Sequence, residues 1–306
     1  MDVLVIGAGV SGLTTAVRLA EAGFRVRVRA DQPPSRTTSA AAGATWGLHL
    51  IGPDARLAGW AWRTHAVLQD LAKDPDTGVR LVSGTEVSRT PAAAPDWAQA
   101  LADFRVCRPD ELLDGFTSGW RFTTPVVDMP AYLAYLTRRL AAAGTAIEPG
   151  AVGELPTEPL VVNCTGVGAR GLVPDPDVDA VRGQVVVVQN PGIDEFLAED
   201  TREETTELTY VIPHGGHVLL GGTAERGRYD LDPDPATATA IVARCAAMLP
   251  ALRDAPVLEH RVGLRPGRPT VRLERDGHVI HNYGHAGSGV SLSWGCADEV
   301  LALATH

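Results

Sequence analysis

The sequence predicts an α/β protein in which a parallel sheet flanked by helices is interleaved with an antiparallel sheet. A short apolar strand, a glycine turn and an amphipathic helix occupy residues 2–22, which is the pattern of a parallel βαβ unit. A second apolar strand runs into a glycine turn at residues 159–169. The middle of the chain is rich in short strands joined by glycine turns, which favours antiparallel hairpins. Parallel segments at both ends, with antiparallel strands between them, imply two domains built from interleaved segments.

The expected elements follow in order along the chain. The first βαβ unit ends with a strand that closes at Asp31, and the irregular stretch "QPPSRTTSAAAGATWG" comes next. Asp128 and Gly144 are expected to be the N-cap and the stop of a helix. The sequences "HGGH" and "RDGH" are typical of hairpin turns. Further helices are expected at 60–71 and 235–248, and further strands at 79–83 and in "GQVVVVQ", "LTYVIPHGGHVLLGGT" and "VRLERDGHVIHNYG".

Composition limits the classes of function. With 306 residues, of which 45% are hydrophobic and 21% charged, the chain can bury a sizeable core. A net charge of −10 and the lack of a basic run argue against nucleic acid as a partner. The four cysteines lack metal-ligand spacing, so neither a metal site nor a disulfide framework is expected. No apolar run is long enough to span a membrane and no leader is recognisable, so we expect a cytoplasmic protein.

The first glycine turn carries the clearest chemical signal. Gly7, Gly9 and Gly12 form G-x-G-x-x-G directly after a strand and at the start of a helix. In such a motif the first glycine makes a tight turn, the second lets a pyrophosphate approach the backbone, and the third packs the helix against the strand. The helix N-terminus offers unpaired N–H groups to the phosphates. Asp31 stands nineteen residues after Gly12, the spacing expected for an acid that binds a ribose. The motif therefore predicts a bound dinucleotide.

The identity of the dinucleotide depends on the rest of the chain. The motif occurs once, so one dinucleotide is expected. The stretch "VVNCTG" is typical of a late strand and turn that close over the adenosine half of a flavin cofactor. In "RTTSAAAG", the hydroxyls of Thr37 and Thr38 are candidates to contact phosphate or water, and the small residues after them suit a flat ring. These features favour FAD over NAD.

Eight motifs then appear in one order: "VIGAGVSGLTTA", "RADQPPSRTTSAAAG", "VVNCTGVGA", "RGQVV", "TYVIP", "LGGT", "GLRPGRP" and "VIHNYGHAGSGVSLSWGCA". Together they resemble the D-amino-acid oxidase family, which consists of FAD enzymes and includes D-aspartate oxidase. The resemblance covers nearly the whole chain. It implies an FAD-binding Rossmann-like domain made of residues 1–50, 128–180 and 262–306. It also implies a substrate-binding α+β domain with an antiparallel sheet, made of residues 51–127 and 181–261.

The resemblance implies noncovalent FAD held by two groups of residues. The N-terminal motif and the adenosine side supply Gly7, Ala8, Gly9, Val10, Ser11, Gly12, Asp31, Thr37, Thr38, Ala42, Gly43, Val152, Thr165 and Gly166. The motif "GLRPGRP", which resembles the family's carboxylate anchor, and the C-terminal glycine segment "VIHNYGHAGSGVSLSWGCA" supply the others. These are Arg265, Gly287, Ser288, Gly289, Val290 and Ser291. Small residues suit this segment because both substrate and protein must approach the flavin closely. The helix that starts near Val290 directs its positive dipole end toward the reduced ring.

The same resemblance implies the reaction. A D-amino acid is expected to lose a hydride from Cα to flavin N5, and oxygen is expected to accept the electrons, giving a 2-oxo acid, ammonia and hydrogen peroxide. Arg265 and Tyr210 match the residues that bind the substrate carboxylate. The carbonyl of Gly287 and the hydroxyl of Ser288 are expected to contact the substrate amine.

Five other side chains are expected to take no part in this reaction. His281 and His285 are interpreted as structural, because hydride transfer from a neutral amine needs no enzymic base. Cys296 is interpreted as a packed thiol rather than the site of a flavin thioether. Arg268 and Arg272 are interpreted as surface arginines.

The substrate class stays open at this point. Neutral D-amino acids are favoured, because a D-aspartate oxidase needs a second cation, for which the candidates are Arg63, Arg202, Arg226 and Arg228. Thr206 stands where some relatives carry a tyrosine in a flexible lid, so the way in which the pocket closes is also undecided. Two alternative functions make different predictions. An NAD-dependent dehydrogenase would purify as a colourless protein, whereas a non-catalytic flavin-binding protein would keep its flavin colour when substrate is added. A homodimer is left open.

Overall fold

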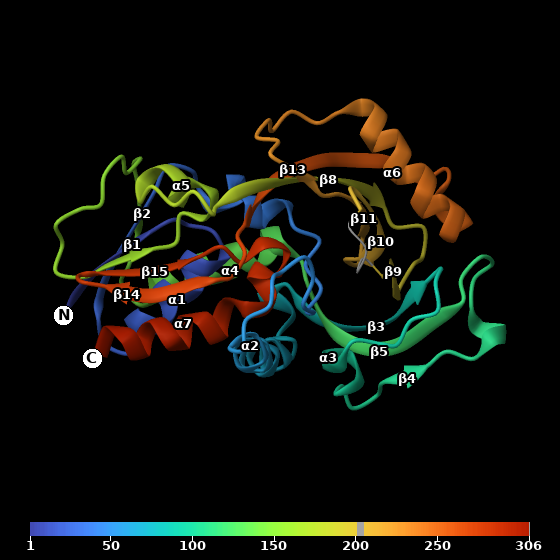
Figure 1. The fold of residues 1–306 in the computed structure, drawn as a ribbon, viewed down its shortest axis with the longest axis horizontal. Helices are drawn as coiled ribbons and strands as arrows, with labels where there is room; N and C mark the ends of the chain where they lie inside the picture. Colours follow the sequence, from blue (N-terminus) through green and yellow to red (C-terminus); the bar gives the residue numbers. More distant parts are fainter. Residues whose placement is uncertain (201–204, 306) are drawn as a thin grey trace.

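The computed structural model describes residues 1–200 and 205–305. Within these residues the strands form one six-stranded and one nine-stranded sheet. The sheets lie in two lobes, and the long strands β8 (Asp179–Gln189) and β13 (Val257–Gly267) run from one lobe into the other (Figure 1).

The first sheet has the strand order β14-β15-β7-β1-β2-β6. All neighbours pair in parallel except β14, which is antiparallel to β15. The helix α1 (Val10–Glu21) connects β1 to β2, so the predicted βαβ unit is confirmed. The strands are β1 (Asp2–Ile6), β2 (Arg25–Ala30), β6 (Ile147–Pro149), β7 (Val161–Asn163), β14 (Arg272–Asp276) and β15 (Val279–Tyr283).

Helices cover one face of this sheet. Alternate strand residues such as Val3 and Val5 pack on that face against α1, α4 (Met129–Ala142) and α7 (Gly289–Thr305). The predicted caps of α4 are confirmed, because the Asp128 carboxylate accepts from Ala131 N–H at 3.3 Å and Gly144 has φ +78°.

The second sheet has the order β12-β8-β11-β10-β9-β3-β5-β4, with β13 paired to β8. The hairpin turn between β10 and β11 confirms the "HGGH" prediction, with Gly215 at φ +72°. One face packs against α6 (Pro235–Met248), which has the bounds predicted for it. The other strands are β3 (Val79–Ser88), β4 (Arg105–Val106), β5 (Ser118–Val127), β9 (Phe196–Glu199), β10 (Glu207–Pro213), β11 (His217–Thr223) and β12 (Glu225–Arg226).

Short elements complete the described chain. The helix α2 (Leu57–Leu71) packs on α7, where Gly295 N–H donates to the Thr64 hydroxyl at 3.0 Å. The remaining helices are α3 (Asp96–Gln99), α5 (Ala169–Leu172), η1 (Pro34–Arg36), η2 (Thr38–Ala41), η3 (Pro75–Thr77), η4 (Pro109–Glu111), η5 (Gly166–Gly168), η6 (Pro250–Leu252) and η7 (Ala286–Ser288).

The interleaved domain division stays a prediction, but its boundaries can be placed on the sheets. Residues 262–267, assigned above to the FAD-binding segments, belong to β13 of the second sheet. Residues 57–71, assigned to the substrate domain, form α2, which packs on α7 of the first lobe.

Candidate active site

A cavity of about 540 Å³ lies between the two sheets and receives residues from both. It brings together most of the residues singled out in the sequence. Those that line it are Gly7, Ala8, Gly9, Val10, Ser11, Asp31, Thr37, Thr38, Ala42, Gly43, Val152, Thr165, Gly166, Tyr210, Arg265, Gly287, Gly289, Val290 and Ser291. Gly12 and Ser288 do not line it.

The N-terminal glycine turn is built by close packing. Gly7 has φ +109°, and a Cβ there would overlap the carbonyl oxygen of Cys164. A Cβ on Gly12 would overlap the carbonyl oxygen of Gly7, which explains why Gly12 supports the turn without reaching the cavity. The first turn of α1 faces the cavity, and Val10 N–H donates to the Ser39 hydroxyl at 2.9 Å. Other N–H groups of this turn have no partner within the helix, so they suit a pyrophosphate.

The hydroxyls of Thr37 and Thr38 are not free to donate to a phosphate, and the earlier expectation is corrected. Thr37 donates to the carbonyl of Pro34 at 2.8 Å. Thr38 donates to the carbonyl of Leu264 at 3.1 Å and accepts from Leu264 N–H at 3.2 Å. Each hydroxyl has a single proton, so its donor capacity is used. The Thr38 hydroxyl instead links the segment "RTTSAAAG", which is expected to contact the cofactor, to β13.

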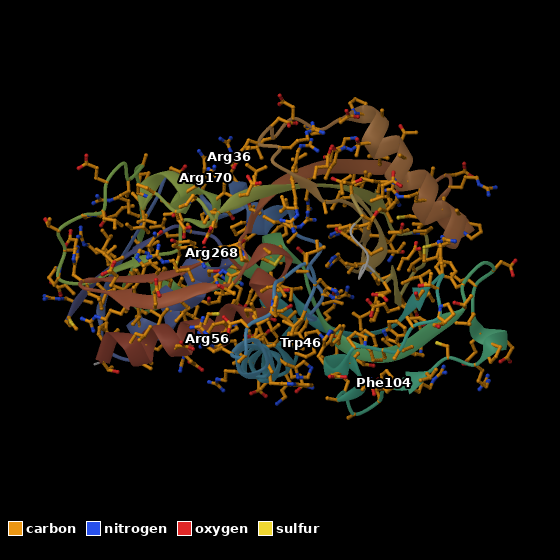
Figure 2. All side chains as sticks on the ribbon, viewed as in Figure 1. Arg36, Trp46, Arg56, Phe104, Arg170 and Arg268 are labelled. Carbon is orange, nitrogen blue, oxygen red and sulfur yellow. The ribbon has the colours of Figure 1, made fainter. Side chains whose placement is uncertain are left out.

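Arg36 is a cation at the cavity that the sequence analysis did not select. It lines the cavity, and its guanidinium has no hydrogen-bond or ion-pair partner within residues 1–200 and 205–305. Figure 2 shows it on the same side of the molecule as α5. A guanidinium there suits an anionic phosphate group. Its position in "PPSRTT", next to the predicted phosphate segment, was the available signal.

The residues expected on the adenosine side of the cofactor line the cavity. Asp31 is exposed at the end of β2 and lines the cavity. The Thr165 hydroxyl donates to the Asn163 side chain at 2.8 Å, which fixes the turn after β7. Gly166 in this turn has φ +58°.

The C-terminal glycine segment forms the opposite wall. A Cβ on Gly287 would lie 2.9 Å from the carbonyl oxygen of His49, so the two chain segments are in close contact. The Ser291 hydroxyl accepts from Gly47 N–H at 3.1 Å. The first residues of α7 line the cavity, so the helix N-terminus faces it as expected.

Ser288 does not have the predicted role. Its hydroxyl accepts from His49 N–H at 2.9 Å and donates to the His49 carbonyl at 2.8 Å. The side chain is 1% exposed and does not line the cavity. Both polar functions are used by one backbone unit, so the hydroxyl fixes the segment around His49 and is not available to a substrate amine.

Arg268 and Arg272 are not the solvated surface arginines expected from the sequence. Arg268 Nε lies 3.1 Å from a carboxylate oxygen of buried Asp175, and the Tyr283 hydroxyl donates to that oxygen at 2.8 Å. Arg272 donates to the Tyr283 hydroxyl at 2.8 Å. Burial raises the pKa of Asp175, but the Tyr283 hydrogen bond and the Arg268 charge bring that pKa below its ordinary value. A Cβ on Gly284 would lie 3.0 Å from Arg268 Cδ, so this cluster supports the start of the glycine segment.

Arg265 and Tyr210 meet at the second sheet. Arg265 projects from β13 and donates to the Thr223 carbonyl at 2.9 Å. Burial raises the pKa of Tyr210, and the neighbouring Arg265 guanidinium opposes that rise. Two glycines make room for the pair: a Cβ on Gly183 would overlap the Arg265 guanidinium, and a Cβ on Gly221 would overlap the Tyr210 ring.

These two glycines, which leave space for Arg265 and Tyr210, were not identified as site residues from the sequence. They lie in "RGQVV" and "LGGT", which were noted only as motifs. Glycine in the interior of a strand often marks a close approach of another group, and that was the available signal.

An aromatic wall with polar neighbours closes another side and was also missed. The wall consists of Trp46, Trp97, Phe122 and Phe196, all lining the cavity. Figure 2 shows Trp46 between α2 and α3, and its indole N–H donates to the carbonyl of Ala61 at 3.0 Å.

Polar groups that line the cavity beside this wall are His49, Glu86 and Glu199. Burial lowers the pKa of His49, against a smaller opposing effect of Asp200. The Glu86 carboxylate accepts from the Trp120 indole at 2.7 Å, and Glu199 accepts from Arg89 at 2.7 Å.

The two histidines of the C-terminal segment differ in position. His281 is buried in β15, does not line the cavity, and lies 3.5 Å from the Asn163 amide. His285 lines the cavity, and burial lowers its pKa to about 4, so its ring is neutral near pH 7. His285 Nε2 and Asn282 Oδ1 are buried at the cavity with no partner among the described residues. Such atoms, with the glycine cradle and the α1 N-terminus, fit a polar planar cofactor such as FAD.

Other positions raised by the sequence lie away from the cavity. Cys296 is fully buried in α7, and burial raises the pKa of its thiol. Arg63 pairs with Asp298, and Arg228 pairs with Glu225 and Asp230. Arg226 and Thr206 do not line the cavity, and Arg202 lies outside the described residues.

Across residues 1–200 and 205–305, no helix combines the length and the apolar character that a transmembrane span needs.

Comparisons with known proteins agree on one family. The family described as "FAD dependent oxidoreductase" matches residues 2–303. A D-amino-acid oxidase of Rubrobacter xylanophilus is 51% identical, covering 98% of this chain and 95% of that protein. One of Streptomyces coelicolor is 48% identical, covering 99% and 97%. A human D-aspartate oxidase is 36% identical, covering 99% and 94%.

Solved structures show the same fold. Glycine oxidase from Geobacillus kaustophilus superposes with a TM-score of 0.85 at 19% identity, covering 99% of this chain and 94% of that chain. The predicted fold class, resemblance and cofactor are confirmed. The chain belongs to the D-amino-acid oxidase-type family of FAD dependent oxidoreductases, and FAD is its cofactor.

Proposed function

We propose that this protein is an FAD-dependent oxidase of D-amino acids with a preference for neutral side chains. The observation that carries the proposal is the meeting of Arg265 and Tyr210 in the same cavity as the glycine turns that suit the cofactor. Two side chains that bind a carboxylate beside a flavin site can hold an amino acid in position for oxidation. Relatives about half identical over nearly the full chain are named D-amino-acid oxidase, which supports the same activity.

The chain's own residues bind and orient the substrate. When bound, FAD supplies the two-electron oxidant for the Cα–N bond and passes the electrons to oxygen as hydrogen peroxide, leaving an imino acid that water hydrolyses to a 2-oxo acid and ammonia. Arg265 binds the carboxylate through its guanidinium, already held by Thr223, and the Tyr210 hydroxyl contacts the same carboxylate. Because burial raises the Tyr210 pKa, the hydroxyl keeps its proton and can donate it.

Orientation follows from two fixed points. With the carboxylate at Arg265 and the amine directed to the Gly287 carbonyl, only one enantiomer presents its Cα hydrogen to the cofactor. His49 and His285 are both neutral near pH 7 because burial lowers their pKa values. They therefore add no positive charge to the cavity.

Neutral side chains are proposed because of the charges at the cavity. Arg36 and Arg265 are the arginines that line it within the described residues, and Arg265 is assigned to the α-carboxylate. The acidic residues Glu86 and Glu199 line it as well, and neither offers a cation to pair with a second substrate carboxylate. A D-aspartate oxidase therefore has less support, although one relative carries that name.

The test is an anaerobic absorbance spectrum of the purified holoprotein with D-alanine, D-valine, D-aspartate and the L forms added separately. We expect D-alanine and D-valine to bleach the flavin band, and the L forms to leave it unchanged. Fastest bleaching by D-aspartate would overturn the neutral preference, and bleaching by none would overturn the oxidase proposal. Formation of hydrogen peroxide in air tests oxygen as the acceptor. The expected cytoplasmic location and a homodimer remain predictions, the latter for light scattering.

A further inference from the structure

We propose that Trp97 limits the size of the substrate side chain, an inference that rests on the proposed function. Trp97 belongs to α3, a four-residue helix between β3 and β5, and its ring lines the cavity. It comes from neither sheet, so its position depends on the rings it touches.

The sheet register places Tyr210 and the aromatic wall on one face. Tyr210 on β10 lies opposite Ala198 on β9. Phe196, two residues before Ala198, is on the same face, since side chains on a strand alternate between faces. Phe196 and Phe122 lie opposite Gly84 from either side, on β9 and β5. A Cβ on Gly84 would overlap the Phe196 ring, so that ring extends across β3.

The wall therefore begins beside the carboxylate anchor and extends away from it. Strands in a sheet are about 4.8 Å apart, so Phe122 on β5, three strands from β10, is displaced roughly 14 Å from Tyr210 in the direction across the strands. The rings of Phe122 and Phe196 are 5.2 Å apart and bridge this distance. A substrate side chain that points from the anchor along this face meets the wall.

Trp97 closes the far end of this space. Its ring lies edge-on to Phe122 at 5.6 Å and 86°, to Trp46 at 5.6 Å and 89°, and to His49 at 5.7 Å and 83°. These perpendicular arrangements are the favoured geometry for aromatic pairs. A Cβ on Gly47 would lie 3.0 Å from Trp97 Cη2, which leaves the indole little room to move back. A longer substrate side chain would therefore collide with a ring held on three sides.

The chain offers a matched control in the same aromatic cluster. Trp62 on α2 contacts Trp46 at 5.0 Å but does not line the cavity. The steady-state kcat/KM values of D-phenylalanine and D-alanine are to be measured for the wild-type holoprotein and for Trp97→Ala, Trp97→Phe and Trp62→Ala, each loaded with FAD.

We expect Trp97→Ala to raise the D-phenylalanine to D-alanine ratio roughly tenfold or more, since one methylene in an apolar pocket already changes kcat/KM 10–200-fold. Trp97→Phe should give a smaller rise, and Trp62→Ala should leave the ratio unchanged. An unchanged ratio in both Trp97 variants, or an equal rise in Trp62→Ala, would overturn the assignment. If Trp97→Ala does not fold, Trp97→Phe alone decides. Absence of turnover of any D-amino acid by the wild type would instead refute the proposed function.

Discussion

Gly183→Ala should damage substrate binding without touching the substrate. A Cβ at Gly183 would lie 2.5 Å from both Cζ and Nη2 of Arg265, whereas ordinary contacts start near 3.4 Å. The guanidinium must therefore move by about 1 Å, which also disturbs its 2.9 Å hydrogen bond to Thr223. A misplacement of about 1 Å can cost roughly 100-fold, so kcat/KM for D-alanine should fall about 100-fold, or about 2.7 kcal/mol. Gly183 is not at a positive φ, so its backbone tolerates alanine.

The assay is peroxide formation with D-alanine, with FAD content measured in parallel. Gly59→Ala is the control, because a Cβ there meets nothing within 4 Å, and it should keep wild-type kinetics. If displacement of Arg265 is the cause, Arg265→Ala should cost much less in the Gly183→Ala background than in the wild type. Wild-type kcat/KM in Gly183→Ala, or additive losses in the double variant, would refute the reasoning.

Three further outcomes are expected. Ser288→Ala should lower the free energy of unfolding by roughly 1–3 kcal/mol in a urea titration, because both polar groups of the half-buried His49 backbone lose their partner. A large loss of kcat with unchanged stability would instead support the contact between Ser288 and substrate. Gly12→Ala should purify without visible flavin absorbance, because its Cβ would overlap the Gly7 carbonyl; retention of one FAD per chain would contradict this packing. Burial lowers the His285 pKa to about 4, so the unfolded chain binds more protons between pH 4 and its ordinary pKa of about 6.5. The free energy of unfolding should therefore fall as pH drops through this range, by up to about 3 kcal/mol, and His285→Asn should flatten the dependence; an equal slope in both proteins would count against it.

Local signals predicted the parts of the fold that depend on neighbouring residues. The βαβ unit, the Asp128 cap and the hairpin at Gly215 all follow from periodicity, capping and turn chemistry within a few residues. The order of motifs then predicted the cofactor and the family, because every motif except "LGGT" contributes residues that line a single cavity.

Side-chain roles that depend on distant contacts could not be predicted. Ser288 looked like a substrate ligand, but its hydroxyl is used by His49, which is 239 residues away in sequence. Arg268 looked solvated because its partner, Asp175, lies in a loop with no distinguishing motif. Trp97 sits in an Ala- and Pro-rich stretch, and only the folded chain shows the three rings around it.

The Thr38 hydroxyl is hydrogen-bonded to both backbone groups of Leu264. This link would couple the binding of FAD to the binding of substrate. Leu264 precedes Arg265, the proposed anchor of the substrate carboxylate, and Thr38 lies in the segment proposed to line the cofactor side. Any movement of β13 at Leu264 would therefore be transmitted to Thr38 through these hydrogen bonds. Linkage is reciprocal, so the factor by which a carboxylate ligand tightens FAD equals the factor by which FAD tightens that ligand. The change in FAD affinity caused by a carboxylate ligand, and the change in ligand affinity caused by FAD, would then measure the same coupling free energy.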